Sequence, residues 1–280
     1  MLRASHSRRD GLTLMELVVV VAILVALASI LVPLIPGLIG RAETSGRATN
    51  SQEIYKAIQL HQGTLTRYPN DWDALTDGST TPLTYVQGFT GTAPPLTIAA
   101  LTGPQTNALR ASGITRLQLM ATTPGSTTTP AGDMTFNPYM DVVDRASATG
   151  ALTLAANGTP NLAVLTPAGQ AQLNLSDNAT TSTGTYVVFG FGKRASIVGT
   201  GVNEAPVNFF DNASLSPNTR YSRYGVVFQV SGIAPNATNT TIIDYSRARL
   251  VRVIRFGNTL GTGDDALNSY WQDVATAGGS

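Results

Sequence analysis

The sequence contains no cysteine and only two histidines, His6 and His61, among its 280 residues. Without cysteine, the chain forms no disulfide bond and offers no thiolate to a metal ion or a substrate. With so few histidines, a Ser-His-Asp triad or a histidine-ligated metal site has almost no side chains from which to be built. These absences argue against the common hydrolytic and metal-dependent active sites.

Charged residues are also scarce, at 12% of the chain, and the 18 Lys and Arg residues nearly balance the 17 Asp and Glu residues. Proteins that bind nucleic acid usually carry a basic face or a basic stripe that contacts the phosphates. The formal net charge here is only +1. Nucleic acid is therefore not an expected partner.

The chain does contain one long apolar run near its N-terminus. Between Leu12 and Val32 the only charged residue is Glu16, and the arginines Arg8 and Arg9 precede the run. A helix of about 21 residues extends about 30 Å, which matches the hydrocarbon core of a bilayer. We therefore expect a transmembrane helix over residues 12–35, with its basic end on the cytoplasmic side.

The residues around the start of this run resemble a known signature. A basic leader, Gly11, the large apolar Leu12, then Thr, Leu, any residue, Glu16 and an apolar stretch are similar to type IV prepilins and type II secretion pseudopilins. The resemblance implies that a membrane peptidase cleaves after Gly11 and methylates the new amino terminus at Leu12, where the family usually has Phe. It also implies a single-pass protein of the bacterial inner membrane, with a periplasmic or extracellular C-terminal domain.

Glu16 raises the question of why an acid lies in an apolar segment, where a charge costs several kcal/mol. Leu12 and Glu16 are four residues apart, so a helix places them on one face, about 6 Å apart along its axis. With an axial offset between stacked subunits, Glu16 would neutralise the amine of a neighbouring Leu12. Glu16 is therefore the predicted assembly residue; the alternative is an acid that is merely solvated at the headgroup level.

Pro33, Pro36 and Gly37 follow the apolar run. Proline removes a backbone N–H and its ring clashes with the preceding turn, so we expect a kinked or melted segment here. Beyond it, apolar residues repeat at helical spacing from Arg41 to Gln62, and Gly63 is the expected stop. In the following turn, Asp71 is expected to cap a short helix.

The sequence as a whole predicts an α+β fold that resembles that of pilins. A long N-terminal transmembrane and spine helix packs on a C-terminal antiparallel sheet, and the domain carries a loop-rich insertion. The expected division is a cleaved leader (1–11), a transmembrane helix (12–35), the soluble half of the spine helix (36–63) and a globular β-rich domain (64–280). Strands are predicted from β-branched and aromatic runs at 115–120, 162–165, 185–192, 224–231, 240–245 and 249–256.

Near the C-terminus, the segment 256–273 combines the Gly-x-Gly pair Gly261 and Gly263 with Asp264 and Asp265 shortly before Trp271. It resembles the C-terminal loop of major pseudopilins, in which a glycine-rich turn and aspartates hold calcium. Asp264 and Asp265 are the candidate ligands, because calcium prefers hard oxygen ligands. Leu267 occupies the position of the second family aspartate, so a solvated turn without a metal is the alternative.

The resemblance implies a subunit without catalytic activity that polymerises into a pseudopilus for type II protein secretion. Its expected partners are the prepilin peptidase and methyltransferase, copies of itself and other pseudopilins, the inner-membrane assembly platform and the lipid bilayer. Two alternatives are open. One is a type IV pilus subunit whose Thr-rich insertion forms an adhesive surface, and the other is a binding or enzymatic ectodomain on a signal anchor.

Overall fold

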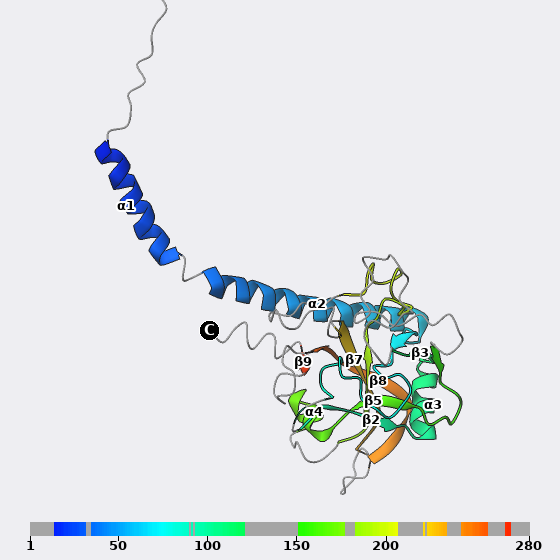
Figure 1. Ribbon diagram of the computed structural model, residues 1–280. Coiled ribbons are helices and arrows are strands. Elements are labelled where there is room, and N and C mark those ends of the chain that lie inside the picture. The colour runs from blue at the N-terminus through cyan, green and yellow to red at the C-terminus, as the bar shows by residue number, and fades with distance from the viewer. Residues whose placement is uncertain are drawn as a thin grey trace, which may run out of the picture. The chain divides into compact units, whose positions relative to one another are not determined.

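A computed structural model describes residues 14–31, 35–89, 91, 93–120, 151–176, 183–206, 221, 223–233, 242–256 and 267–269. The chain divides into two compact units, residues 1–46 and residues 47–280. Figure 1 labels the helices and most of the strands. Each unit is described by itself below.

The first unit contains helix α1 (Leu14–Leu31) and the beginning of helix α2 (Ile35–Leu65). Glu16 lies in the first turn of α1, where a negative charge is favoured by the helix dipole. The large apolar side chains of α1 are exposed on all of its sides, from 49% for Val20 to 81% for Leu14. A helix that is apolar all round is normally buried against other apolar groups.

The expected membrane-spanning helix is not found. Helix α1 has 18 residues, about 27 Å of helix, against about 30 Å of bilayer hydrocarbon. Over the described residues, no helix has both the length and the apolar character that crossing a membrane requires. The predicted transmembrane helix over residues 12–35 is therefore wrong, and so is the predicted single-pass location in the bacterial inner membrane.

Helix α2 contains the whole segment from Arg41 to Gln62 that was predicted to be helical, and its residues from Arg47 onward belong to the second unit. Ile54 and Ile58 face inward and are buried at 3% and 0% exposure. The helix continues through the expected stop at Gly63 and ends at Leu65. Thr66 follows with a left-handed φ of 57°, the conformation that commonly terminates helices.

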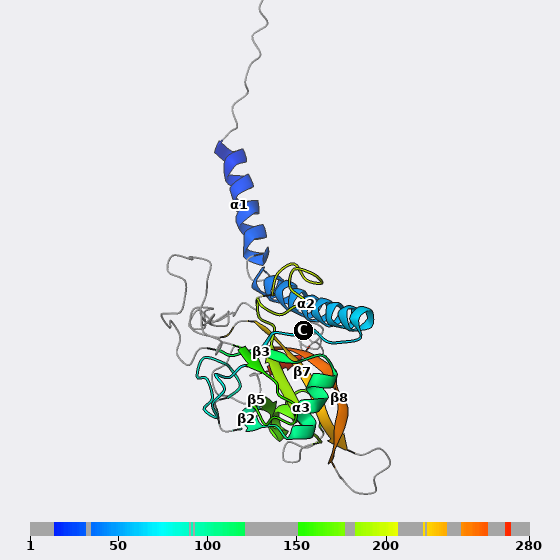
Figure 2. The same cartoon turned by 90° about the vertical axis from the view of Figure 1, so that its right-hand side faces the viewer.

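The sheet of the second unit has nine strands in the described part of the chain. Figures 1 and 2 show it from two sides. They are β1 (Trp72–Asp73), β2 (Leu96–Ala100), β3 (Arg116–Gln118), β4 (Ala151–Thr153), β5 (Asn161–Leu165), β6 (Tyr186–Gly190), β7 (Tyr224–Ile233), β8 (Ile242–Phe256) and β9 (Leu267–Ser269). One edge of β6 pairs with β7, which continues to β8 and β9. The other edge is shared, because Val187 pairs with β5 and Gly190 with β1. Two arms therefore branch from β6, one through β5 to β2 and one through β1 and β3 to β4.

The predicted fold class is wrong in its architecture, although helices with one sheet are loosely consistent with α+β. The long spine helix is not shown: the described residues form α1 and α2, and residues 32–34 lie outside the description. The sheet is mixed instead of antiparallel, because β1 and β3 run parallel, with Trp72 opposite Leu117. The segment expected to be a loop-rich insertion contributes β2 to β5 to this sheet, so the sheet is not C-terminal.

Both faces of the central strand β6 are buried, which explains its uninterrupted apolar sequence. Val187 and Phe189 face a core that also contains Ile54 and Ile58 of α2. Tyr186 and Val188 face a second core on the opposite side. Because successive side chains of a strand point to opposite faces, a strand between two cores has no polar side.

Two further helices pack against this sheet. Helix α3 (Gly103–Ala111) begins with a capping box in which the Thr102 side chain accepts from the Gln105 N–H and the Gln105 side chain accepts from Thr102 N–H. It packs along β8, as Figure 2 shows. Helix α4 (Pro167–Gln172) is capped by Thr166, whose side chain accepts from the Gly169 N–H.

Two helical glycines provide a test of this packing. A Cβ on Gly169 would collide with the carbonyl oxygen of Pro95, which already accepts from the Thr166 N–H at 2.9 Å. Gly169→Ala is therefore expected to lower the free energy of unfolding by about 2 kcal/mol. Gly63→Ala is the matched control. A Cβ there meets nothing within 4 Å, so this change should raise stability by about 0.5–1 kcal/mol.

Urea denaturation of the two variants measures both values. Opposite signs are the expected result, because both changes gain helix propensity and only one meets backbone atoms. A Gly169→Ala protein as stable as the Gly63→Ala protein would contradict the described contact between α4 and Pro95.

Candidate functional site

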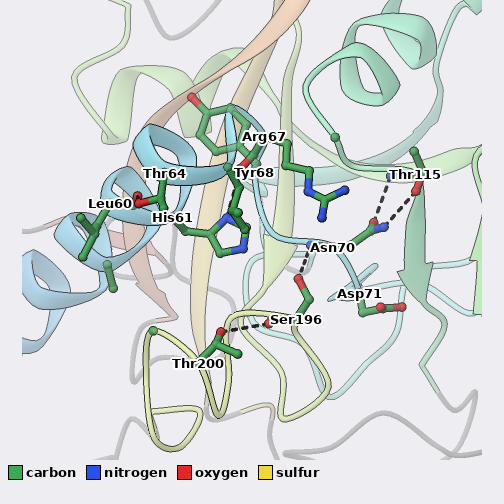
Figure 3. Close-up of a pocket in the computed structure, with 14 residues that line it drawn as sticks. Leu60, His61, Thr64, Arg67, Tyr68, Asn70, Asp71, Thr115, Ser196 and Thr200 are labelled. Carbon is green, nitrogen blue, oxygen red and sulfur yellow. Dashed lines mark hydrogen bonds between the residues drawn. The ribbon is translucent and has the colours of Figure 1, made fainter.

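A partly open cavity of about 680 Å³ lies beside the C-terminal end of α2, and Figure 3 shows its lining. The lining comes from α2, from the turn that follows it, and from two segments distant in sequence. These residues are Ala57, Leu60, His61, Thr64 and Leu65, then Arg67, Tyr68, Asn70 and Asp71, then Gly113, Thr115, Ser196, Thr200 and Gly201. All of them belong to the second unit.

His61 enters the cavity from α2 with a defined tautomer. Its Nδ1 lies 3.1 Å from the backbone carbonyl oxygen of Arg67. A carbonyl oxygen only accepts hydrogen bonds, so Nδ1 is the donor and carries the proton. The other nitrogen, Nε2, is then an acceptor when the imidazole is neutral.

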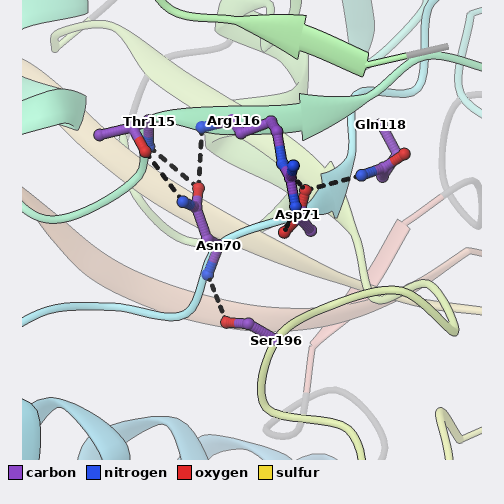
Figure 4. Close-up of polar contacts among 6 residues, drawn as sticks. All are labelled: Asn70, Asp71, Thr115, Arg116, Gln118 and Ser196. Atoms are coloured by element: carbon purple, nitrogen blue, oxygen red, sulfur yellow. Dashed lines mark hydrogen bonds and ion pairs between the residues drawn. The ribbon is translucent and has the colours of Figure 1, made fainter. Parts of the chain in front are cut away.

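The turn after α2 is fixed by Asn70, which ties three segments together (Figure 4). Its Oδ1 accepts from the backbone N–H groups of Thr115 and Arg116 at 3.0 and 2.8 Å. Its own N–H donates to Ser196 Oγ at 2.8 Å, and the Ser196 N–H donates to its carbonyl oxygen at 2.9 Å. Residues 70, 115 and 196 are thus held together without any contribution from a ligand.

Asp71 does not cap a helix, contrary to the prediction from the sequence. The following residues form β1, and Asp71 has a left-handed φ of 61°. Its carboxylate accepts from Arg116 Nε and Nη2 at 2.5 and 2.7 Å, and from Gln118 Nε2 at 2.6 Å. The hydrogen bond and the charge of Asp71 raise the pKa of Arg116. The negative charge of Asp71 is therefore matched by a bidentate cation.

Arg67 differs from Arg116 in its surroundings. Its side chain is exposed and projects toward the cavity (Figure 3). Within the part of the chain that the structure describes, its guanidinium makes no ion pair or hydrogen bond. Gly113 lies against the base of the Arg67 side chain, since a Cβ on Gly113 would be 2.5 Å from the Arg67 Cβ.

Two groups of the cavity lining that could take part in chemistry already have partners within the protein. Ser196 Oγ is used as an acceptor by Asn70, and the only hydrogen bond described for the His61 ring goes to a main-chain oxygen. A nucleophilic serine requires a base within hydrogen-bond distance. The described residues offer no such pair here, and they contain no cluster of three or more His, Asp or Glu side chains that could hold a metal ion.

The sequence-predicted site residues are not brought together by the described structure. Gly11, Leu12 and Pro33, as well as Asp264 and Asp265, lie outside the described residues. Glu16 lies in the first turn of α1. Pro36 and Gly37 lie in the first turn of α2, where proline is tolerated because the early N–H groups have no intrahelical acceptor.

No protein-family model, curated protein or solved structure matches this chain. The resemblance to prepilins and pseudopilins therefore depends on the N-terminal motif and the C-terminal loop of the sequence.

Proposed function

We propose that this chain is a filament subunit of the pseudopilin class, which assembles into a pseudopilus for type II protein secretion after cleavage behind Gly11. The observation that supports this most directly is the continuous exposed apolar surface of α1. The motif from Gly11 to Glu16 stands immediately before and within this surface. The subunit acts by assembling, with no catalytic step of its own.

The apolar surface of α1 is too large to be left in water. The large apolar side chains from Leu14 to Leu27 expose about half or more of their area, and complete burial of such a side chain from full exposure contributes about 1.5–3 kcal/mol. Exposed apolar patches of more than a few hundred Å² usually mark interaction sites. Copies of the same helix, packed side by side in a filament, bury this surface on every side.

The proposal includes two kinds of partner. A prepilin peptidase with methyltransferase activity removes residues 1–11 and methylates Leu12. Other copies of the chain, together with related pseudopilins and their assembly platform, then form the filament. Cleavage precedes assembly, because the pairing proposed for Glu16 requires the free amine of Leu12.

Mass spectrometry of the protein from cells with an active prepilin peptidase tests the processing step. We expect a mature chain that begins with N-methyl-Leu12. Gly11→Val should keep residues 1–11 attached, because a branched side chain occupies the position before the cleaved bond. Gly46→Ala is a matched control outside the leader, where a Cβ meets nothing within 4 Å, and it should be cleaved normally. Recovery of wild-type protein with Met1 intact would refute the proposal.

A further inference from the structure

The cavity beside α2 has no role in the filament assembly proposed above. Its volume of about 680 Å³ is within the range of small-molecule sites. We propose that it binds an organic acid that has one carboxylate, an adjacent N–H or O–H donor, and an apolar body. The carboxyl end of a peptide with an apolar last residue has this chemistry.

The charge of the cavity lining selects a monovalent anion. Asp71 is neutralised by the two hydrogen bonds from Arg116. Arg67 has no counterion among the described residues, so it leaves one uncompensated positive charge at the rim. A single guanidinium matches one carboxylate through two parallel hydrogen bonds. A phosphate dianion would bring one negative charge more than this lining neutralises.

His61 explains why the proposed ligand needs a hydrogen-bond donor beside its carboxylate. Because Nδ1 donates to the Arg67 carbonyl oxygen, the neutral imidazole has only an acceptor, Nε2, left for a ligand. An acceptor next to a bound carboxylate is favourable only if the ligand supplies a donor there. The bond also links His61 directly to the backbone of Arg67, and both side chains project toward the same space in Figure 3.

The apolar body of the ligand has a matching wall. Ala57, Leu60 and Leu65 line the α2 side of the cavity, and Leu60 is 71% exposed. Covering such a side chain is favourable in proportion to the apolar area removed from water. Ser196 and Thr200 line another side of the cavity. Within their segment, Thr200 Oγ1 donates to the Ser196 carbonyl oxygen at 3.3 Å.

The cavity walls are held in place before any ligand arrives. The reciprocal bonds between Asn70 and Ser196 join the α2 turn to the 192–202 segment. Left-handed, non-glycine backbone at Thr66 and Asp71 brackets the turn that presents Arg67. Such conformations cost about 1–3 kcal/mol each and concentrate at functional sites. Preformed walls lower the entropic cost of binding.

Isothermal titration calorimetry of the full chain with N-acetylphenylalanine tests the inference. This probe has a carboxylate, an adjacent N–H and an apolar body, and N-acetylphenylalanine amide is the same molecule without the charge. We expect saturable binding of the acid, and no binding of the amide or of inorganic phosphate. Equal binding of acid and amide, or tighter binding of phosphate, would overturn the assignment, as would the absence of any saturable heat with the acid.

Variants of Arg67 locate the site. Arg67→Met should weaken binding of the acid by at least about tenfold, because a charge-assisted pair is lost. Arg67→Lys should give an intermediate loss, since an ammonium cannot form the two parallel bonds. Lys193→Met removes an exposed cation of the neighbouring segment that does not line the cavity, so it should leave the affinity unchanged.

The Arg67 variants are expected to melt at the wild-type temperature, because the side chain is exposed. If Arg67→Met nevertheless unfolds, the Arg67→Lys protein decides the question. If a folded Arg67 variant binds the acid with wild-type affinity, the acid binds elsewhere. The same conclusion follows if Lys193→Met loses as much affinity for the acid as Arg67→Met does. Either result is independent of cleavage after Gly11 and of filament formation.

Discussion

Replacement of Trp72 by alanine is expected to lower the free energy of unfolding by about 3–5 kcal/mol, the usual cost of removing a fully buried large aromatic side chain. Trp72 is 0% exposed although it lies in a strand of only two residues. Its ring meets Phe191 edge-on at 5.3 Å between centroids and Phe228 at 6.3 Å. The alanine variant leaves a cavity where β1, β6 and β7 meet.

Trp72→Phe separates the packing of the ring from its hydrogen bond. The indole Nε1–H donates to the carbonyl oxygen of Pro69 at 2.6 Å in a buried position. Phenylalanine keeps an aromatic ring and loses this donor, so we expect a smaller loss of about 1–2 kcal/mol. Leu60→Ala is the exposed control, because the Leu60 side chain is 71% exposed on α2, and its effect should stay within about 0.5 kcal/mol.

Urea denaturation of the full chain, monitored by far-ultraviolet circular dichroism, measures all three variants. A loss below about 1.5 kcal/mol for Trp72→Ala would contradict the position of Trp72 in the core, because that value lies well under the cost of truncating a buried aromatic.

Local patterns in the sequence predicted several elements correctly. The β-branched run that contains Val187 and Val188 forms β6, and the run that contains Val226 and Val227 forms β7. The helical spacing of Ile54 and Ile58 placed one face of α2 in the core, as observed. These predictions succeeded because each depends on the period of apolar residues within one segment.

Features that depend on distant residues were not predicted. Asp71 looks like a helix cap in its local sequence, but its carboxylate is taken up by Arg116 and Gln118, which lie far along the chain. The two strands predicted at 240–245 and 249–256 are one strand, β8, because β7 pairs along nearly its full length. Pairing partners of this kind are fixed by tertiary contacts that no local pattern contains.

The cavity beside α2 also escaped prediction for this reason. Its residues come from α2, from the turn at Arg67, and from the segments around Thr115 and Ser196, and no motif spans these positions. One local signal existed. Arg67 and His61 lie six residues apart at the end of a helix, a spacing that brings both side chains near the last turn, where the chain reverses. That spacing alone does not distinguish a binding site from a solvated helix end.

Replacement of Glu16 by alanine is expected to abolish filaments of the variant alone, if the proposed function is correct. In an assembled filament, the carboxylate of one subunit pairs with the methylated amine of Leu12 in its neighbour, away from water. Removal of one partner of a buried ion pair leaves the other uncompensated and costs about 3–5 kcal/mol. The cost recurs at every subunit contact. Folding of the second unit, which does not contain Glu16, should be unaffected.

Filament yield in electron microscopy, normalised to the amount of processed protein, measures this effect. Glu16→Gln should fail as Glu16→Ala does, because it keeps the shape and loses the charge, whereas Glu16→Asp should assemble in part, being charged and one methylene shorter. Glu53→Ala is the matched control, since it removes an exposed acid from α2 in the second unit, outside the apolar surface of α1, and keeps Glu16. Mixtures with wild-type chains should recover some filaments, because the wild-type subunits supply the carboxylate. If Glu16→Ala gives the wild-type yield, the charge does not set the register between subunits, and its role is confined to the first turn of α1.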